Sequence, residues 1–325
     1  MAIEQLVIGT FTQTFNKLFY DELVVGKLAH TEFKNAAKLG DEVDVLMPGT
    51  AQLFNYAGGD LPDAEEVTNS ATKIRIDRAK AFHFELSEFE KRAIEKAPDL
   101  KQKVNLIKEY SSDAVKQFAA SVDEAYADLY TRAGISVDNG STTANTCSAI
   151  KIEDEKFAKD IFAFMAAKFK RGDSKGHNNW VDGQMIAIIP PEYQFYLGKL
   201  EDYQYVESGH KKMEKGFIGR LAGWDIVVSN NIATYTETTT SGSGGDTVTT
   251  THTIYQPLFG IKGKTLAGGV SDNLSTKSYM PEKNFNTRYK GYGVYGVGAP
   301  RADFLGTVKI ECGLEASNVL VKASS

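Results

Sequence analysis

The chain has 325 residues, a formal net charge of −5, 42% hydrophobic residues and 24% charged residues. Its length predicts two or more lobes, and its interspersed acids and bases argue against a protein that mainly grips a phosphate backbone, which needs a dense basic patch. No apolar run approaches the roughly 20 residues of a membrane-spanning helix, and residues 1–5 lack the basic and apolar regions of a signal peptide.

Residues 5–39 alternate aromatic and aliphatic side chains with polar ones. Their spacing predicts one or two short amphipathic helices. Gly40 ends this segment. We therefore expect an arm over residues 1–39 that lies across the body or across a neighbour, with Phe11 and Phe15 among its contacts.

Residues 40–93 are typical of a long hairpin. One strand is predicted over 40–49 and a second over 73–86, where the apolar side chains fall on one parity (Ile74, Ile76, Phe82, Phe84, Leu86). This period of two indicates a strand with one solvated face. Arg78 and Lys80 interrupt the apolar pattern, so we expect that part of the strand to leave the body. A two-stranded arm is marginal alone in water, which predicts that it lies on a partner.

The tip of the hairpin, residues 50–70, combines Gly and Pro with clustered acids. The acids fit either a solvated tip or a salt-bridging contact with a neighbouring subunit. The predicted inter-subunit contacts of the whole chain are Asp63, Glu65, Glu66, Arg75, Arg78, Lys80, Phe82, Phe84, Phe11 and Phe15.

Residues 98–132 give the strongest helical pattern. Pro98 suits a first helical position, and Gly134 predicts the C-terminal stop. Charged residues, Asp123 among them, run between the apolar ones and are expected on a solvated face. Steps of three or four residues form one face from Leu100, Val104, Ile107, Ser111, Ala114, Phe118, Val122, Ala125 and Leu129. About 35 residues span about 50 Å, which favours a spine helix over the alternative, a coiled coil.

The second half alternates strands and helices around one sheet, which predicts an α+β fold. After a polar connector at 136–148, an amphipathic helix is expected over 154–170, with its apolar stripe at Phe157, Ile161, Phe164, Met165 and Phe169. Further expectations are a buried strand at 181–189, a short helix at 190–196, a turn and strand at 216–230, a β-ribbon or surface loop at 235–253, and final strands at 255–264 and 291–310.

No catalytic, cofactor or metal site is predicted. Cys147 and Cys312 fit small buried hydrophobes of a reducing compartment, with a disulfide or a catalytic thiol as the alternative. The five histidines are scattered; His83 fits a surface position, and His177, in a polar loop, is the best metal or catalytic candidate. Phosphate-binding loops, nucleophile elbows and a complete zinc-deaminase signature are absent from the sequence.

The order of these elements resembles the major capsid (coat) proteins of tailed bacteriophages, which have the Hong Kong-97-type shell fold. The resemblance is carried by the hairpin strands at 40–48 and 73–86, the acidic segment after them, the helix at 98–132, the strand-to-helix step at 188–191, the turn and strand at 219–230, and residues 292–303. It implies an N-terminal arm (1–39), an extended loop (40–93), a peripheral domain with the spine helix (94–150), an axial domain with a central sheet (151–284, insertion 235–253), and C-terminal strands returning to the peripheral domain (285–325).

The resemblance further implies hexamers and pentamers in an icosahedral shell around double-stranded DNA. DNA would be enclosed without sequence-specific binding, and no membrane is involved. Portal, scaffolding and decoration proteins are the implied partners, and the subunit would assemble in the host cytoplasm into the virion capsid, without enzymatic activity. Two alternatives stay open: an encapsulin-like nanocompartment shell, which needs a cargo-docking groove, and an unrecognised α+β hydrolase or binding protein, which needs a convergent polar pocket.

Overall fold

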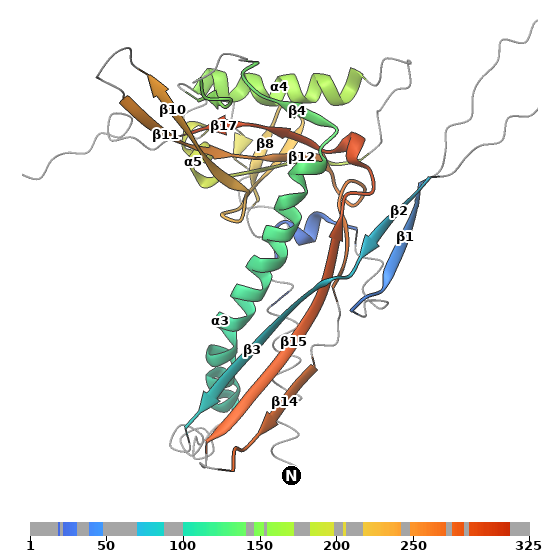
Figure 1. Cartoon of the computed structure of the whole chain (residues 1–325), viewed down its shortest axis with the longest axis vertical. Helices are drawn as coiled ribbons and strands as arrows, with labels where there is room; N and C mark the ends of the chain where they lie inside the picture. The colour runs from blue at the N-terminus through green and yellow to red at the C-terminus, as the bar shows by residue number, and fades with distance from the viewer. Residues whose placement is uncertain are drawn as a thin grey trace, which may run out of the picture.

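The computed structural model describes residues 19, 22–30, 39–47, 70–87, 100–140, 146–152, 155–171, 183–197, 204–205, 217–241, 248–270, 275–282 and 286–312. They form a compact part that carries helices α4 and α5, a long limb in which helix α3 runs beside strands β3 and β15, and a hairpin, β1–β2, that extends away from the limb (Figure 1). This mixture of helices and sheets confirms the predicted α+β class.

The compact part is built on a seven-stranded sheet with the order β4-β16-β12-β6-β9-β8-β7. Its strands are β4 (Ile135–Val137), β16 (Gly306–Val308), β12 (Leu258–Ile261), β6 (Met185–Ile189), β9 (Trp224–Val228), β8 (Phe217–Leu221) and β7 (Gln204–Tyr205). The central strand β6 pairs in parallel with β9 and antiparallel with β12. Its five residues are all apolar and all but the half-buried Met185 are buried, as expected of a strand that is covered on both faces.

Helices α4 (Glu155–Arg171) and α5 (Pro191–Leu197) pack on this sheet and confirm the two helices predicted in this region. The predicted apolar stripe of α4 is partly wrong, because Phe157 and Phe164 are 43% and 46% exposed. The helix instead buries a face rotated away from these two rings, made of Ala158, Ile161, Phe162, Met165, Ala166 and Phe169. The helical spacing of apolar residues shows that one side of α4 is buried, but it does not show which residues lie at the margins of that side.

The predicted β-ribbon is confirmed as strands β10 (Thr234–Ser241) and β11 (Val248–Tyr255), which pair antiparallel. The ribbon belongs to a second sheet with the order β10-β11-β17-β5. The other two strands are β17 (Ile310–Glu311) and β5 (Ile150–Lys151), which pair in parallel. One sheet therefore brings together three distant parts of the chain: the segment after the spine helix, the ribbon, and the end of the described residues.

In the limb, α3 (Leu100–Ala127) continues as the 3-10 helix η3 (Asp128–Arg132), which confirms the spine helix. Pro98 lies outside the described residues. Gly134 does not end the helix through a left-handed conformation, because the capping residue is Ala133 in an extended conformation. A Cβ at Gly134 would lie 2.8 Å from the Ala302 carbonyl oxygen, so glycine is required there by close backbone contact.

The expected pairing of the long hairpin is only half right. Strand β1 (Glu42–Met47) pairs with β2 (Ser70–Arg75), but β3 (Arg78–Leu86) pairs along its whole length with β15 (Thr287–Gly298). The segment with Arg78 and Lys80 therefore lies in the limb, paired with β15, and does not project from the subunit. Strands β13 (Ala267–Val270) and β14 (Ser275–Tyr279) also pair with β15. Strand β3 can have one solvated face and still belong to this sheet, because α3 covers only the opposite face of the sheet.

Asp123 is the clearest departure from the expected solvated face of the spine helix. Its side chain is buried, and its two carboxylate oxygens accept the backbone N–H groups of Val24 and Gly26, both at 2.9 Å. Gly26 opens the 3-10 helix η1 (Gly26–Leu28). Among the described arm residues, Phe19 and Glu22 are also helical, and Asp123 attaches the 3-10 helix that follows them to α3. Phe11 and Phe15 lie outside the described residues.

Candidate assembly surfaces

The base of the hairpin is packed tightly against β15. A Cβ at Gly296 would lie 2.5 Å from the Arg75 carbonyl oxygen, and a Cβ at Gly298 would lie 2.8 Å from Cγ1 of Ile74. Glycine at both positions lets the chain that leaves β2 cross β15 in direct backbone contact. Ile74 and Ile76 are buried at this crossing. The direction in which the hairpin leaves the body is therefore fixed by packing.

The two hairpin strands carry charged side chains at and next to this base. Glu42 lies opposite Arg75 in the ladder and accepts hydrogen bonds from Arg75 at 2.8 Å and from Lys73 at 3.3 Å. These two cations hold the pKa of Glu42 below its usual value. Exposed pairs of this kind add little to stability. These charged side chains do, however, limit unspecific pairing of the hairpin strands with other strands.

An open hollow of about 960 Å³ lies between the start of β3 and the C-terminal end of the spine helix. Its charged lining consists of four cations and two carboxylates: Lys73, Arg75, Arg78, Arg132, Asp77 and Asp128. Glu42 also binds Lys73 and Arg75, and the remaining excess of positive charge suits an acidic segment. Two of the predicted contact residues, Arg75 and Arg78, thus meet in one place that we call the basic hollow.

The other predicted contact residues are placed differently. Lys80 is exposed on β3, whereas Phe82 and Phe84 are half-buried and pack against the core that α3 shares with β15. The Phe84 ring also stacks on Tyr289, with ring centres 5.4 Å apart. These two phenylalanines therefore already have a role within the subunit. Asp63, Glu65 and Glu66 lie outside the described residues.

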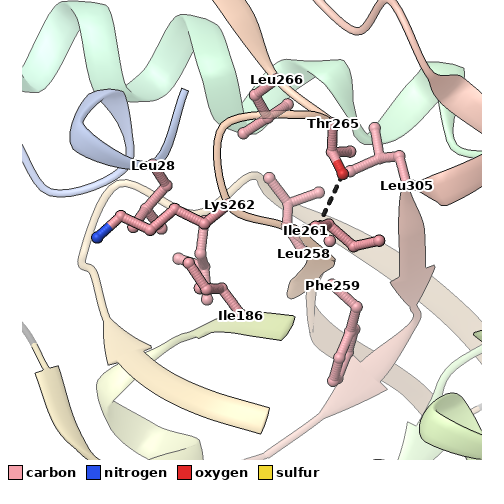
Figure 2. A pocket seen from close by; sticks show the side chains of 11 residues that line it. Leu28, Ile186, Leu258, Phe259, Ile261, Lys262, Thr265, Leu266 and Leu305 are labelled. Carbon is pink, nitrogen blue, oxygen red and sulfur yellow. Dashed lines mark hydrogen bonds between the residues drawn. The ribbon is translucent and has the colours of Figure 1, made fainter. Parts of the chain in front are cut away.

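A small apolar pocket of the compact part offers no catalytic chemistry. It lies between the arm residue Leu28 and strands β6 and β12 and has an empty volume of about 280 Å³, part of it open to solvent (Figure 2). Thr265 Oγ1 accepts the Ile261 N–H at 2.8 Å and lies 3.3 Å from the Phe304 carbonyl oxygen, to which it donates. Its lining holds no carboxylate, histidine or cysteine; its polar side chains are Lys262 and Thr265, and the Thr265 hydroxyl is already bonded to backbone groups of the wall. His177 lies outside the described residues.

Comparison with known proteins identifies the family of the chain. The family model for phage capsid proteins matches residues 87–310, more than two thirds of the chain. The chain belongs to the phage capsid protein family. It is a capsid shell protein whose place is the virion capsid, as the order of elements predicts, and this family favours a structural role over the nanocompartment and hydrolase alternatives.

The fold of the capsid subunit is similar to that of solved capsid structures. The capsid of Ralstonia phage GP4 matches with a TM-score of 0.59 at 10% identity, covering 91% of each chain. Mycobacterium phage Che8 matches with a TM-score of 0.55 at 18% identity, covering 88% of this chain and 90% of that one. The capsid of Cyanophage P-SCSP1u gives 0.56 at 13% identity, covering 89% and 88%. These likenesses confirm the Hong Kong-97-type fold. No curated protein matches the subunit.

In the described ranges of the capsid subunit, no helix is both long and apolar enough to cross a membrane. Sequence patterns missed two packing features within the subunit. The buried carboxylate of Asp123 has no local signal. The repeated glycines of residues 291–298 do carry one, because glycine inside a strand marks a close backbone approach.

Proposed function

We propose that the subunit assembles with itself as hexamers and pentamers into an icosahedral shell around the double-stranded DNA of a tailed phage. The observation that carries this proposal is the hairpin β1–β2, packed at its base on β15 and exposed beyond it. A two-stranded ribbon is marginal in water on its own. A neighbouring subunit that covers the hairpin would stabilise it. Each copy would then contribute one hairpin and one surface that receives the hairpin of a neighbour.

The receiving surface that we propose is the basic hollow of a neighbour. Its partner would be the acidic tip of the hairpin, with Asp63, Glu65 and Glu66 meeting Arg75 and Arg78. Opposite charge on the two surfaces speeds encounter and selects the orientation of docking. In the same proposal, further contacts come from the exposed Lys80 and, along the arm, from Phe11 and Phe15. Phe82 and Phe84 would contact a neighbour through the part of each ring that stays exposed.

The remaining partners are proposed on the chemistry of the whole chain. A net charge of −5 suits a wall that encloses DNA without binding its sequence. The resemblance to tailed-phage coat proteins adds three partners to the proposal: a portal for DNA entry, a separate scaffolding protein, and decoration proteins on the surface of a non-enzymatic shell. Assembly would take place in the host cytoplasm.

Expression of the chain alone and with a scaffolding protein tests the proposal, read by analytical ultracentrifugation and negative-stain electron microscopy. Closed shells, tubes or capsomers are the expected result. A monomer under both conditions would contradict it.

A charge exchange tests the contact itself. The double variant Glu65→Lys/Glu66→Lys should assemble poorly, and adding Arg78→Glu should restore particles. Lys168→Glu, an exposed change on α4, is the matched control and should have no effect. Normal assembly of the double variant, or a defect that Arg78→Glu does not rescue, would contradict the tip–hollow contact and leave the shell function standing.

A further inference from the structure

A thiol, an imidazole and a carboxylate converge at the base of the β-ribbon. One ligand atom each of Cys147, His252 and Glu311 lies within 4.8 Å of the others. Cys147 precedes β5, His252 lies on β11 and Glu311 on β17. The sheet brings these distant segments together, because β17 pairs with β11 through Ile254 and with β5 through Lys151.

Hydrogen bonds orient the imidazole of His252 at both nitrogens. Nδ1 lies 2.8 Å from Oε1 of Glu311, and Nε2 lies 2.8 Å from Oγ1 of Thr239. His252 and Glu311 are largely buried, with side chains 18% and 22% exposed. When the Nε2 proton is donated to the Thr239 hydroxyl, the Nδ1 lone pair faces a carboxylate oxygen. Two such acceptors need a proton or a cation between them.

The surroundings of Cys147 are also negatively charged. Burial raises the pKa of its thiol, and the nearby carboxylates of Glu311 and Glu237 raise it further. Glu237 accepts the backbone N–H of Ser148 at 2.9 Å and its hydroxyl at 2.6 Å. The Lys309 ammonium lies 3.5 Å from the Ser148 hydroxyl, and its charge also acts on Glu237. A bound divalent cation would compensate these converging negative groups and favour the thiolate.

We propose that Cys147, His252 and Glu311 bind a zinc ion that joins the ribbon to the end of the described chain. Sulfur, imidazole nitrogen and carboxylate oxygen are the ligands that Zn²⁺ takes in proteins, usually four in a tetrahedron. Water or Glu237 supplies the fourth ligand. Binding releases the thiol proton and the proton held between His252 and Glu311. Thr239 holds the other imidazole proton and so keeps Nδ1 directed at the metal.

Zinc at this place would fasten three segments to one another: the ribbon, β17 and the connector after the spine helix. It would stabilise the compact part of each subunit and would not depend on contacts between subunits. The inference is therefore separate from the proposed hairpin contact and can be tested on unassembled protein.

The first test uses unassembled wild-type protein and Co²⁺ in place of Zn²⁺. We expect one Co²⁺ per subunit, with visible bands of a tetrahedral ion and a near-ultraviolet band from thiolate-to-cobalt charge transfer. Cys147→Ser should remove the charge-transfer band, and His252→Ala should weaken binding at least tenfold. The matched controls are Cys312→Ala, a buried thiol next to Glu311 in the sequence, and His83→Ala, an exposed histidine on β3. Both controls should bind as the wild type does.

A second test needs no variant that could fail to fold. One equivalent of Zn²⁺ should slow the alkylation of Cys147 by iodoacetamide at least tenfold and raise Tm by several degrees, and EDTA should reverse both effects. Alkylation at the same rate with and without Zn²⁺, well under one bound metal per subunit, or a Co²⁺ spectrum unchanged in Cys147→Ser would each overturn the proposal.

Discussion

Removing the Asp123 carboxylate should detach the arm segment from the spine helix. In Asp123→Ala, the N–H groups of Val24 and Gly26 lose acceptors that each lie at 2.9 Å in a buried site. A hydrogen bond to a charged group contributes about 1.5–3 kcal/mol, and an orphaned buried donor adds to the loss. Relief of the desolvated charge offsets part of this. We expect a loss of about 3 kcal/mol in the free energy of unfolding, and about half of that for Asp123→Asn, which keeps one acceptor.

Urea unfolding of the unassembled subunit, extrapolated linearly to water, measures this loss. In a chain of this size 3 kcal/mol corresponds to a fall in Tm of about 6 °C. Glu124→Gln, an exposed neighbour on the same helix, is the control and should change stability by less than about 0.5 kcal/mol. Limited proteolysis gives a second readout, because cleavage within residues 22–30 should become faster in Asp123→Ala. Equal stability of Asp123→Ala and the control would refute the reasoning.

Three further changes probe the limb and the sheet. Gly296→Ala would place a Cβ 2.5 Å from the Arg75 carbonyl oxygen, so we expect a loss of about 2–3 kcal/mol in urea unfolding, and unchanged stability would show that the crossing is loose. Trp224→Ala removes a fully buried ring whose Nε1 donates to a backbone carbonyl, and calorimetry should show a loss of about 4 kcal/mol, against less than half of that for Trp224→Phe. Glu85, whose pKa is lowered by hydrogen bonds from Asn286 and Arg288, contributes stability above its unfolded pKa that disappears as pH falls through the lower folded value. The urea midpoints of wild type and Glu85→Gln should therefore differ at pH 7 and converge near pH 3, and a gap that persists at pH 3 would contradict this.

Elements with a strong local pattern could be predicted from the sequence. The spine helix has one continuous apolar face, and β6 is an apolar run followed by Pro190 and Pro191, whose restricted backbone favours the start of the next helix. The ribbon β10–β11 follows from its threonine-rich strands around a glycine-rich tip. In each case the deciding interactions lie within one element or between two neighbours in sequence.

Features that depend on distant partners could not be predicted in this way. The period-2 pattern of residues 78–86 shows that one face is buried, but not that the pairing partner is β15, some 200 residues away. Asp123 belongs by type to a solvated face, and its partners lie 97 and 99 residues away. Cys147, His252 and Glu311 form a cluster only after β5, β11 and β17 pair. Sequence spacing carries none of this information.

Strand β15 explains how one subunit can hold both a stable body and a projecting hairpin. Its register with β3 ends at the Tyr295–Arg78 pair, and within the next few residues β2 crosses it at Gly296 and Gly298. Tyr295 also reaches back to the spine helix, where its hydroxyl lies 2.9 Å from that of Ser121. A force on the hairpin is therefore passed to β15 and to α3 through close-packed groups that have little room to yield. Docking of the hairpin on a neighbour would then orient the whole limb, whereas a flexible tether would leave neighbouring limbs free to rotate.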